Sequence, residues 1–163
     1  MLGFAFKADT GDTRESAAIT LIKDFQAEKA LINIYDPQVE RSQIWLDLQE
    51  ASPDKPLGDS ASTFLPAFWR LTHLFFFYLV QRQVTICSSA LDACKNAEAV
   101  VIATEWKEFK EIDWEKVYEG MNKPAFIFDG RLLLNADELR KIGFRVKTIG
   151  RGEKFWEILS NIR

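Results

Sequence analysis

The side chains best suited to chemistry lie near the start of the chain. An apolar run over 2–6 leads into a polar stretch with two basic residues, Lys7 and Arg14, among aspartates, threonines and a glycine. A helical pattern follows, and Asp12 or Thr13 is expected to cap its start. Because cations and free helix N–H groups attract anions, this loop predicts a binding site for a negative group, most simply a phosphate. The alternative is an ordinary strand-to-helix turn with solvated charges.

Two further loops carry functional side chains directly after apolar runs. The Thr-Glu-Trp string at 104–106 follows the charge-free run 99–103, and the Asp-Gly-Arg string at 129–131 follows the run 124–128. In an open α/β sheet, ligands bind outside the carboxyl ends of the strands, where such loops lie. The three loops are therefore expected to converge at one edge of the sheet.

Convergence of the loops would bring together three cations, Lys7, Arg14 and Arg131. These side chains could hold a diphosphate, with Phe6 or Trp106 beside a base or a sugar. The other interpretation is structural, in which each arginine pairs with an Asp or Glu of a neighbouring loop. The residues alone leave both interpretations open.

The elements that position these loops alternate between strand and helix patterns. Such alternation gives βαβ units, which predict a parallel sheet with right-handed crossovers. We therefore predict a single α/β domain of about six strands. Ser88 or Ser89 is expected to cap the third helix, and Gly143 to end the last. The expected strands are 2–6, 30–35, 84–86, 99–103, 124–128 and 144–150, and the expected helices are 15–28, 40–48, 88–97, 108–119 and 135–142.

Asp36 ends the second expected strand, where dinucleotide-binding folds place an acidic residue on the ribose. The Gly-x-Gly-x-x-Gly fingerprint that accompanies such a residue is absent after the first strand. We therefore interpret Asp36 as a turn residue rather than as an NAD ligand.

Composition limits the class of protein. The chain has 163 residues, 47% of them hydrophobic, which suits one globular domain. A net charge of −3 gives no basic surface, so nucleic acid is not expected as a partner. Cys87 and Cys94 form neither a disulfide framework nor a metal-ligand pattern, and we expect buried free thiols, no metal site and a cytoplasmic location.

Several strings in this sequence occur together, and in the same order, in one family of proteins. The strings are Gly3–Lys7, Asp9–Ser16, Tyr35–Pro37, Ala103–Trp106 and Phe126–Arg131. On these strings the chain resembles the C-terminal, UDP-binding domain of UDP-glucose 6-dehydrogenases, in the UDP-glucose/GDP-mannose dehydrogenase family. The resemblance implies a Rossmann-like, three-layer α/β fold with a mostly parallel sheet.

The resemblance also implies an activity and a set of site residues. UDP-glucose 6-dehydrogenases oxidise UDP-glucose to UDP-glucuronate with two NAD⁺, through a covalent intermediate on a cysteine. By motif, Arg14 falls at an NAD contact from the far side of the cleft between domains. Ala8 stands where many relatives carry a second lysine. Leu132 stands where some relatives carry a second arginine. The substrate-binding positions are Phe6, Lys7, Asp9, Thr10, Gly11, Asp12, Thr13 and Arg131.

The family's glycine-rich NAD motif and its nucleophile string are absent from this sequence. We therefore assign no catalytic residue, exclude Cys87 and Cys94 as nucleophiles, and predict that the chain alone is inactive. NAD would be bound mainly by a missing N-terminal half, and a full-length enzyme is expected to be a homo-oligomer. The chain begins inside an apolar run, which suggests the tail of a longer protein or a gene model that starts late.

The stretch at about 60–82 interrupts the predicted domain, which otherwise spans 1–150, with a tail at 151–163. The resemblance stops near Leu57 and resumes at Gln83, which favours an insertion foreign to the domain, such as translated intron. A buried native element is the second interpretation. A membrane anchor at 64–80 is the third, although its clean apolar part is too short to span a bilayer. The alternative functions are thus a free UDP-sugar-binding or subunit-assembly module, and a membrane-associated protein.

Overall fold

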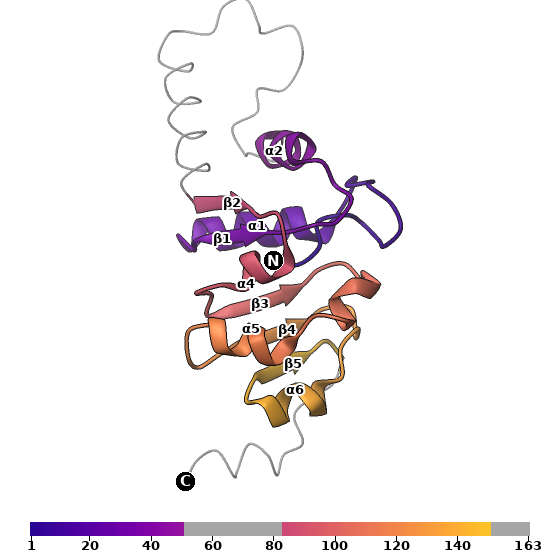
Figure 1. Cartoon of the computed structure of the whole chain (residues 1–163). Helices are drawn as coiled ribbons and strands as arrows, with labels where there is room; N and C mark the ends of the chain where they lie inside the picture. The colour runs from indigo at the N-terminus through magenta and orange to yellow at the C-terminus, as the bar shows by residue number, and fades with distance from the viewer. Residues whose placement is uncertain (51–82, 151–163) are drawn as a thin grey trace, which may run out of the picture.

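The computed structural model describes residues 1–50 and 83–150 (Figure 1). The predicted insertion at about 60–82, the anchor segment 64–80 and the tail 151–163 lie outside the described residues. Within the described part, no helix is long and apolar enough to cross a membrane. The interpretation of those segments therefore stays a prediction.

The described residues form five strands, all parallel to their neighbours, in two sheets. The first sheet pairs β1 with β2, and the second has the order β3-β4-β5. Leu2 bridges the two sheets, because it pairs with Tyr35 beyond β1 and with Ile102 of β3. Figure 1 shows the resulting stack, with the N-terminus between β1 and β3. The strands are β1 (Ile32–Ile34), β2 (Val84–Ile86), β3 (Ala99–Ile102), β4 (Phe126–Asp129) and β5 (Arg145–Thr148).

The strand expected at 2–6 is wrong, since only Leu2 pairs as a strand residue would, and the count is five rather than six. The backbone leaves the sheet at Gly3, whose φ is +91°. The next two amides, of Phe4 and Ala5, donate to the Asp36 carboxylate instead of to a neighbouring strand. A side chain thus replaces the ladder partner that would have extended the strand.

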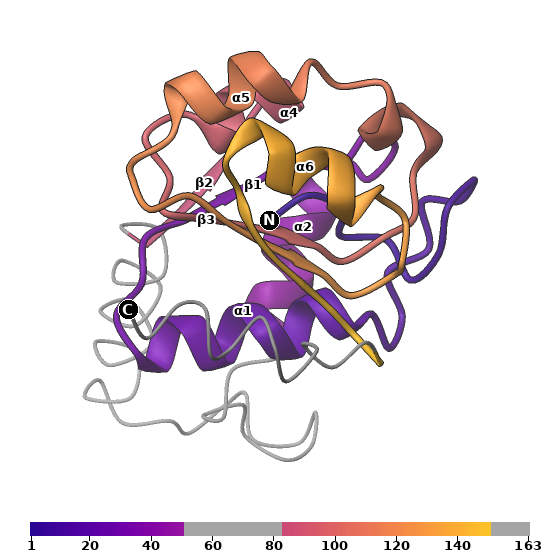
Figure 2. The same cartoon turned by 90° about the horizontal axis from the view of Figure 1, so that it is seen from below.

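Helices lie on both faces of the sheet and make three layers. Figure 2 shows α1 (Ala17–Ala27) below the sheet and α4 (Ala90–Cys94), α5 (Trp114–Gly120) and α6 (Ala136–Ile142) above it. The helix α2 (Arg41–Glu50) packs beside α1. The 3₁₀ turn η2 (Lys107–Lys110) follows β3. The predicted Rossmann-like α/β class is confirmed.

The helix ends follow the capping rules, with one correction. Ser89 caps α4, and Asn135 accepts the N–H groups of Asp137 and Glu138 at the start of α6. The cap of α1, however, is Ser16 rather than Asp12 or Thr13. Its hydroxyl accepts from Ala18 N and donates to Phe4 O at 2.7 Å, so the cap also fixes the preceding loop.

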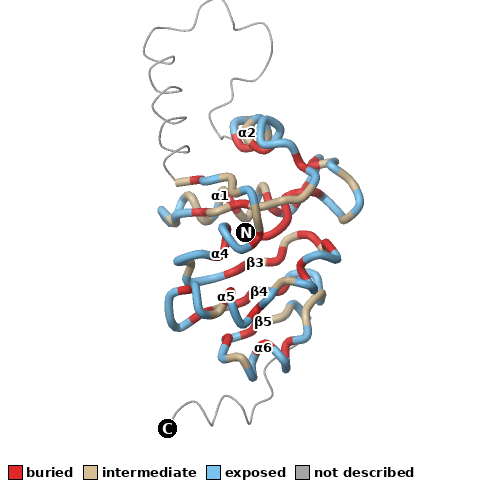
Figure 3. Tube along the Cα trace, in the orientation of Figure 1, coloured by how far each residue is buried: buried red, intermediate tan, exposed pale blue. Residues whose placement is uncertain are grey.

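The core lies between the sheet and the helices, and its residues line the strands (Figure 3). Ile34, Ile102 and Ile127 are fully buried.

Cys94 is buried as expected, and burial raises the pKa of its thiol to about 11. Cys87 is only half-buried, which corrects the expectation, although desolvation still raises its pKa. Raised thiol pKa values disfavour the reactive thiolate.

Candidate functional site

The three loops predicted to converge meet at Arg131. Its guanidinium Nε donates to Glu105 in the loop after β3, and its NH2 group donates to the Phe6 carbonyl in the first loop, at 3.3 Å. Arg131 itself follows β4. The first loop and η2 lie on the same side of the sheet in Figure 1. The site is therefore a junction of loops at the carboxyl edge of the strands.

The backbone at the start of the first loop is fixed at every polar group from Phe4 to Phe6. Phe4 O accepts from Ser16, Ala5 O accepts from Thr104 Oγ1 at 2.7 Å, and Phe6 N donates to Asp12 O at 2.8 Å. The two remaining amides bind Asp36, and Phe6 O binds Arg131. The loop is thus ordered before any ligand arrives.

Two predicted binding side chains extend from this fixed backbone into solvent. The Phe6 side chain is 51% exposed, unusually high for an aromatic ring in a packed domain. Lys7 is exposed and has no ion-pair partner within residues 1–50 and 83–150. An exposed aromatic ring, followed in sequence by an ammonium with no ion pair among the described residues, suits a ligand with both a ring and a negative charge.

Arg14 lies in a local ion pair rather than beside Arg131. Its Nε and NH2 groups donate to the two oxygens of Asp12, at 2.9 and 2.7 Å. The bidentate contact lowers the pKa of Asp12 to about 2, chiefly through the hydrogen bonds from Arg14. Because the Arg14 side chain is 87% exposed, the pair contributes little to stability. Arg131 thus makes the ion pair with a neighbouring loop that the structural interpretation expected, whereas Arg14 pairs with Asp12 of its own loop.

The remaining residues of the first loop shape its turn. Asp9 is exposed and has a φ of +62°, a left-handed conformation that costs energy for a residue other than glycine. The Thr10 hydroxyl accepts from Asp12 N at 3.1 Å, and Gly11 is exposed. Thr13 is only 5% exposed, so its side chain lies within the loop rather than on its surface.

The loop after β4 is organised by Asp129. This carboxylate is 1% exposed and accepts from Arg131 N at 3.0 Å and from Leu134 N at 2.9 Å. Leu132, with a φ of +54°, turns the chain between them and is 52% exposed. Asp129 thus holds the backbone of the loop that carries Arg131, and its oxygens are occupied by protein N–H groups.

The hydrogen bond from Arg131 makes Glu105 a stronger acid than usual. Partial burial acts to raise its pKa, but hydrogen bonds from Arg131 and from the backbone of Glu105 and Ala8, with the charge of Arg131, outweigh burial and lower the pKa. A lowered folded-state pKa stabilises the protein above the unfolded pKa, and this contribution is lost as the pH falls through the folded value.

Acidification is therefore expected to break the contact between Glu105 and Arg131 only below the ordinary pKa of a glutamate. Because both side chains are about one-third exposed, the stability involved should be below about 1 kcal/mol. The Arg131 Nε–H resonance, followed by NMR from pH 7 to pH 3, checks this. Glu105→Gln should remove the pH dependence of this resonance. A titration midpoint above the ordinary pKa of a glutamate would contradict the expected lowering of the Glu105 pKa.

Asp36 is a site residue whose importance sequence reasoning underestimated. Its Oδ2 accepts from the amides of Phe4 and Ala5, at 2.7 and 3.0 Å, and from the Trp106 indole, at 3.1 Å. Its Oδ1 accepts from Gln38 N and Val39 N. The last two bonds form the turn that was predicted, whereas the first three join loops that are distant in sequence.

The surroundings of Asp36 do not fit a dinucleotide ribose. Both oxygens of Asp36, the residue at the ribose-binding position, are bonded to protein N–H groups. Trp106, 5% exposed, packs beside it. Asp36 is therefore not available to bind the ribose of NAD, whereas the Arg14 side chain is exposed enough to reach a cofactor held elsewhere. No cluster of three metal-ligating side chains occurs among the described residues.

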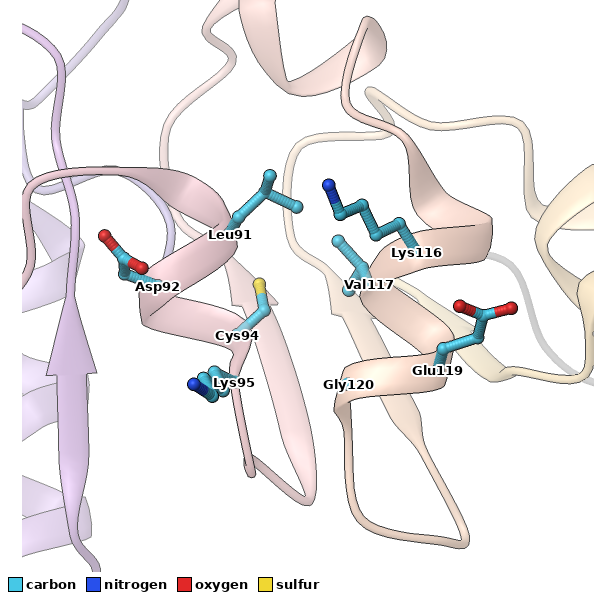
Figure 4. Close-up of a pocket in the computed structure, with 8 residues that line it drawn as sticks. All are labelled: Leu91, Asp92, Cys94, Lys95, Lys116, Val117, Glu119 and Gly120. Atoms are coloured by element: carbon cyan, nitrogen blue, oxygen red, sulfur yellow. The ribbon is translucent and has the colours of Figure 1, made fainter.

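A groove between α4 and α5 lies apart from the three loops (Figure 4). It has a volume of about 510 Å³, and none of the predicted site residues lines it. Lys95 and Lys116 contribute positive charge, and Asp92 and Glu119 contribute negative charge. This mixed lining offers no preference for an anion, so we assign the candidate site to the loops.

A family model and several known proteins match most of this chain. A model of the UDP-glucose/GDP-mannose dehydrogenase family, UDP binding domain, matches residues 1–136. UDP-glucose 6-dehydrogenase 4 of Arabidopsis thaliana is 44% identical over 156 residues, which cover 96% of this chain and 30% of that protein. UDP-glucose 6-dehydrogenase of Bos taurus is 45% identical over 153 residues, covering 93% and 27%. The chain thus spans about 30% of the length of these relatives.

A solved structure supports the fold. The structure of a UDP-D-ManNAc dehydrogenase from Pyrococcus horikoshii matches with a TM-score of 0.57 and 24% identity. The match covers 94% of this chain and 25% of that one.

Proposed function

Since the chain belongs to the UDP-glucose/GDP-mannose dehydrogenase family, whose UDP binding domain it carries, we propose that its three loops bind the UDP part of UDP-glucose. The family resemblance inferred from the motifs is confirmed. One observation supports the assignment of the site above others: Arg131 joins all three loops, and its contact at Phe6 O immediately precedes Lys7, which has no ion pair among the described residues.

The proposed roles follow from exposure and charge. Lys7 and Arg131 would neutralise the diphosphate, because Lys7 is unpaired in the described residues and the Arg131 guanidinium can form further hydrogen bonds. Phe6 would lie against the base or the sugar. The loop of Asp9, Thr10, Gly11, Asp12 and Thr13 would enclose the ligand, mainly through its backbone, since Thr13 is buried.

Arg14 is proposed to contact NAD that is bound mainly by other residues of a longer enzyme. NAD, when bound, would accept hydride from the sugar. The side chain is exposed enough for this role, but it would have to share its charge with Asp12. The proposed reaction of the whole enzyme oxidises UDP-glucose to UDP-glucuronate, and its four electrons would go to two NAD⁺. In that setting we propose a cytoplasmic homo-oligomer.

The chain alone is expected to bind UDP-glucose without oxidising it. Isothermal titration calorimetry of UDP-glucose, with GDP-mannose as the control ligand, tests the binding. Incubation with UDP-glucose and NAD⁺, followed by absorbance of the reduced cofactor, tests the activity. A preference for UDP-glucose with no turnover is the expected result. Equal affinity for both nucleotides would contradict the proposed ligand, and clear turnover would contradict the predicted inactivity.

A further inference from the structure

Asp36 receives more hydrogen bonds than a turn requires. Two backbone amides, of Gln38 and Val39, suffice to close the turn after β1, and both bind Oδ1 at 2.9 and 3.0 Å. The other oxygen, Oδ2, faces away from this turn. It gathers three donors from the first loop and from the loop after β3.

The donors on Oδ2 lie directly beside the proposed binding residues. Phe4 and Ala5 immediately precede Phe6 and Lys7, and Trp106 immediately follows Glu105, the partner of Arg131. A carboxylate has no N–H of its own and can accept from all three donors at once. Hydrogen bonds to a charged acceptor are roughly twice as strong as neutral ones. The carboxylate thus ties the two halves of the site together.

We propose that Asp36 is the positioning residue of the nucleotide site, which it serves by fixing the first loop and Trp106 relative to each other. Asp36 contacts the loop backbone and an indole, not the ligand. Its effect on binding is therefore indirect, through the placement of Phe6, Lys7 and Glu105. This inference rests on the proposed function.

The direct test is Asp36→Asn. Asparagine keeps the size of the side chain and one oxygen, which can still close the turn at Gln38 and Val39. Its NH₂ group would then face three N–H donors, so the first loop and Trp106 should separate. We expect roughly a tenfold loss of UDP-glucose affinity, equivalent to about 1.4 kcal/mol. The indole N–H resonance of Trp106, assigned with Trp106→Phe, should also shift.

A control variant separates positioning from general destabilisation. Val117→Ala truncates a buried residue of α5, away from the three loops, and should lower the melting temperature without changing affinity. If Asp36→Asn fails to fold, Trp106→Phe provides the test, because it removes one donor and keeps an apolar ring. A few-fold loss of affinity is then expected.

Wild-type affinity in a folded Asp36→Asn, or in Trp106→Phe if the first variant does not fold, would overturn the proposal. Failure of the proposed function has a different signature. If the unmodified chain binds no UDP-glucose, affinity measurements on the variants give no information. The amide resonances of Phe6 and Lys7 still report the position of the first loop. Unchanged resonances in Asp36→Asn would overturn the positioning role even then, whereas shifted resonances would support it.

Discussion

Replacing Arg131 with alanine is expected to weaken UDP-glucose binding by about 10- to 100-fold. Loss of charge-assisted hydrogen bonds costs about 1.5–3 kcal/mol, and each 1.4 kcal/mol changes affinity tenfold. The domain should remain folded, because the Arg131 side chain is about one-third exposed. Isothermal titration calorimetry gives the affinity, and thermal unfolding gives the stability.

Two further variants show whether the charge or the shape of the Arg131 side chain matters, and whether any exposed arginine would have the same effect. Arg131→Lys keeps the charge but not the planar fork, so an intermediate affinity is expected. Arg140→Ala removes an exposed arginine of α6 that pairs with Asp137, and should leave the affinity unchanged. If Arg131→Ala binds UDP-glucose as tightly as the unmodified chain, Arg131 has a structural role only.

Gly3→Ala is expected to destabilise the domain by about 2–6 kcal/mol. An added Cβ would lie 2.5 Å from the Thr104 side chain and 2.6 Å from its backbone nitrogen. The φ of +91° adds strain for any residue with a Cβ. Forced overpacking and backbone strain each cost about 1–3 kcal/mol. Chemical denaturation measures the free energy of unfolding.

Gly120→Ala is the matched control for this substitution. A Cβ at Gly120 meets nothing within 4 Å, and the residue lies at the end of α5. Alanine there should be neutral or stabilising by about 0.5–1 kcal/mol. An equal, small effect of both substitutions would show that the close contact between Gly3 and Thr104 does not exist in solution.

Local patterns predicted the elements that carry their own signals. The charge-free run at 99–103 became β3, and Asn135 and Gly143 flank the predicted helix α6. Both features depend on neighbours in sequence. The same holds for Ser89, which was one of two residues expected to cap α4.

The errors occurred where distant residues decide the structure. The first strand was predicted too long because its amides bind Asp36, which lies 31 and 32 positions further along the chain. The cap of α1 was misplaced because Ser16 also donates to Phe4 O, a contact across the loop. The bond between Asp36 and Trp106 spans 70 positions. Spacing alone carries no signal for such contacts.

The arrangement of the candidate site was predicted in part. Convergence of the three loops followed from their position after parallel strands, and the structure brings Phe6, Glu105 and Arg131 into contact. The sequence did not indicate which cation stays available. Only the structure separates Lys7, which has no ion pair among the described residues, from Arg14, which Asp12 holds.

The most direct test of the central claim is an NMR titration of the ¹⁵N-labelled chain with UDP-glucose. We expect saturable shifts of the amides in the loop from Phe6 to Arg14, of Glu105 and of Arg131, with the α4–α5 groove unaffected. Shifts confined to the groove, or no saturable shifts at all, would contradict the assignment of a UDP-sugar site to the three loops.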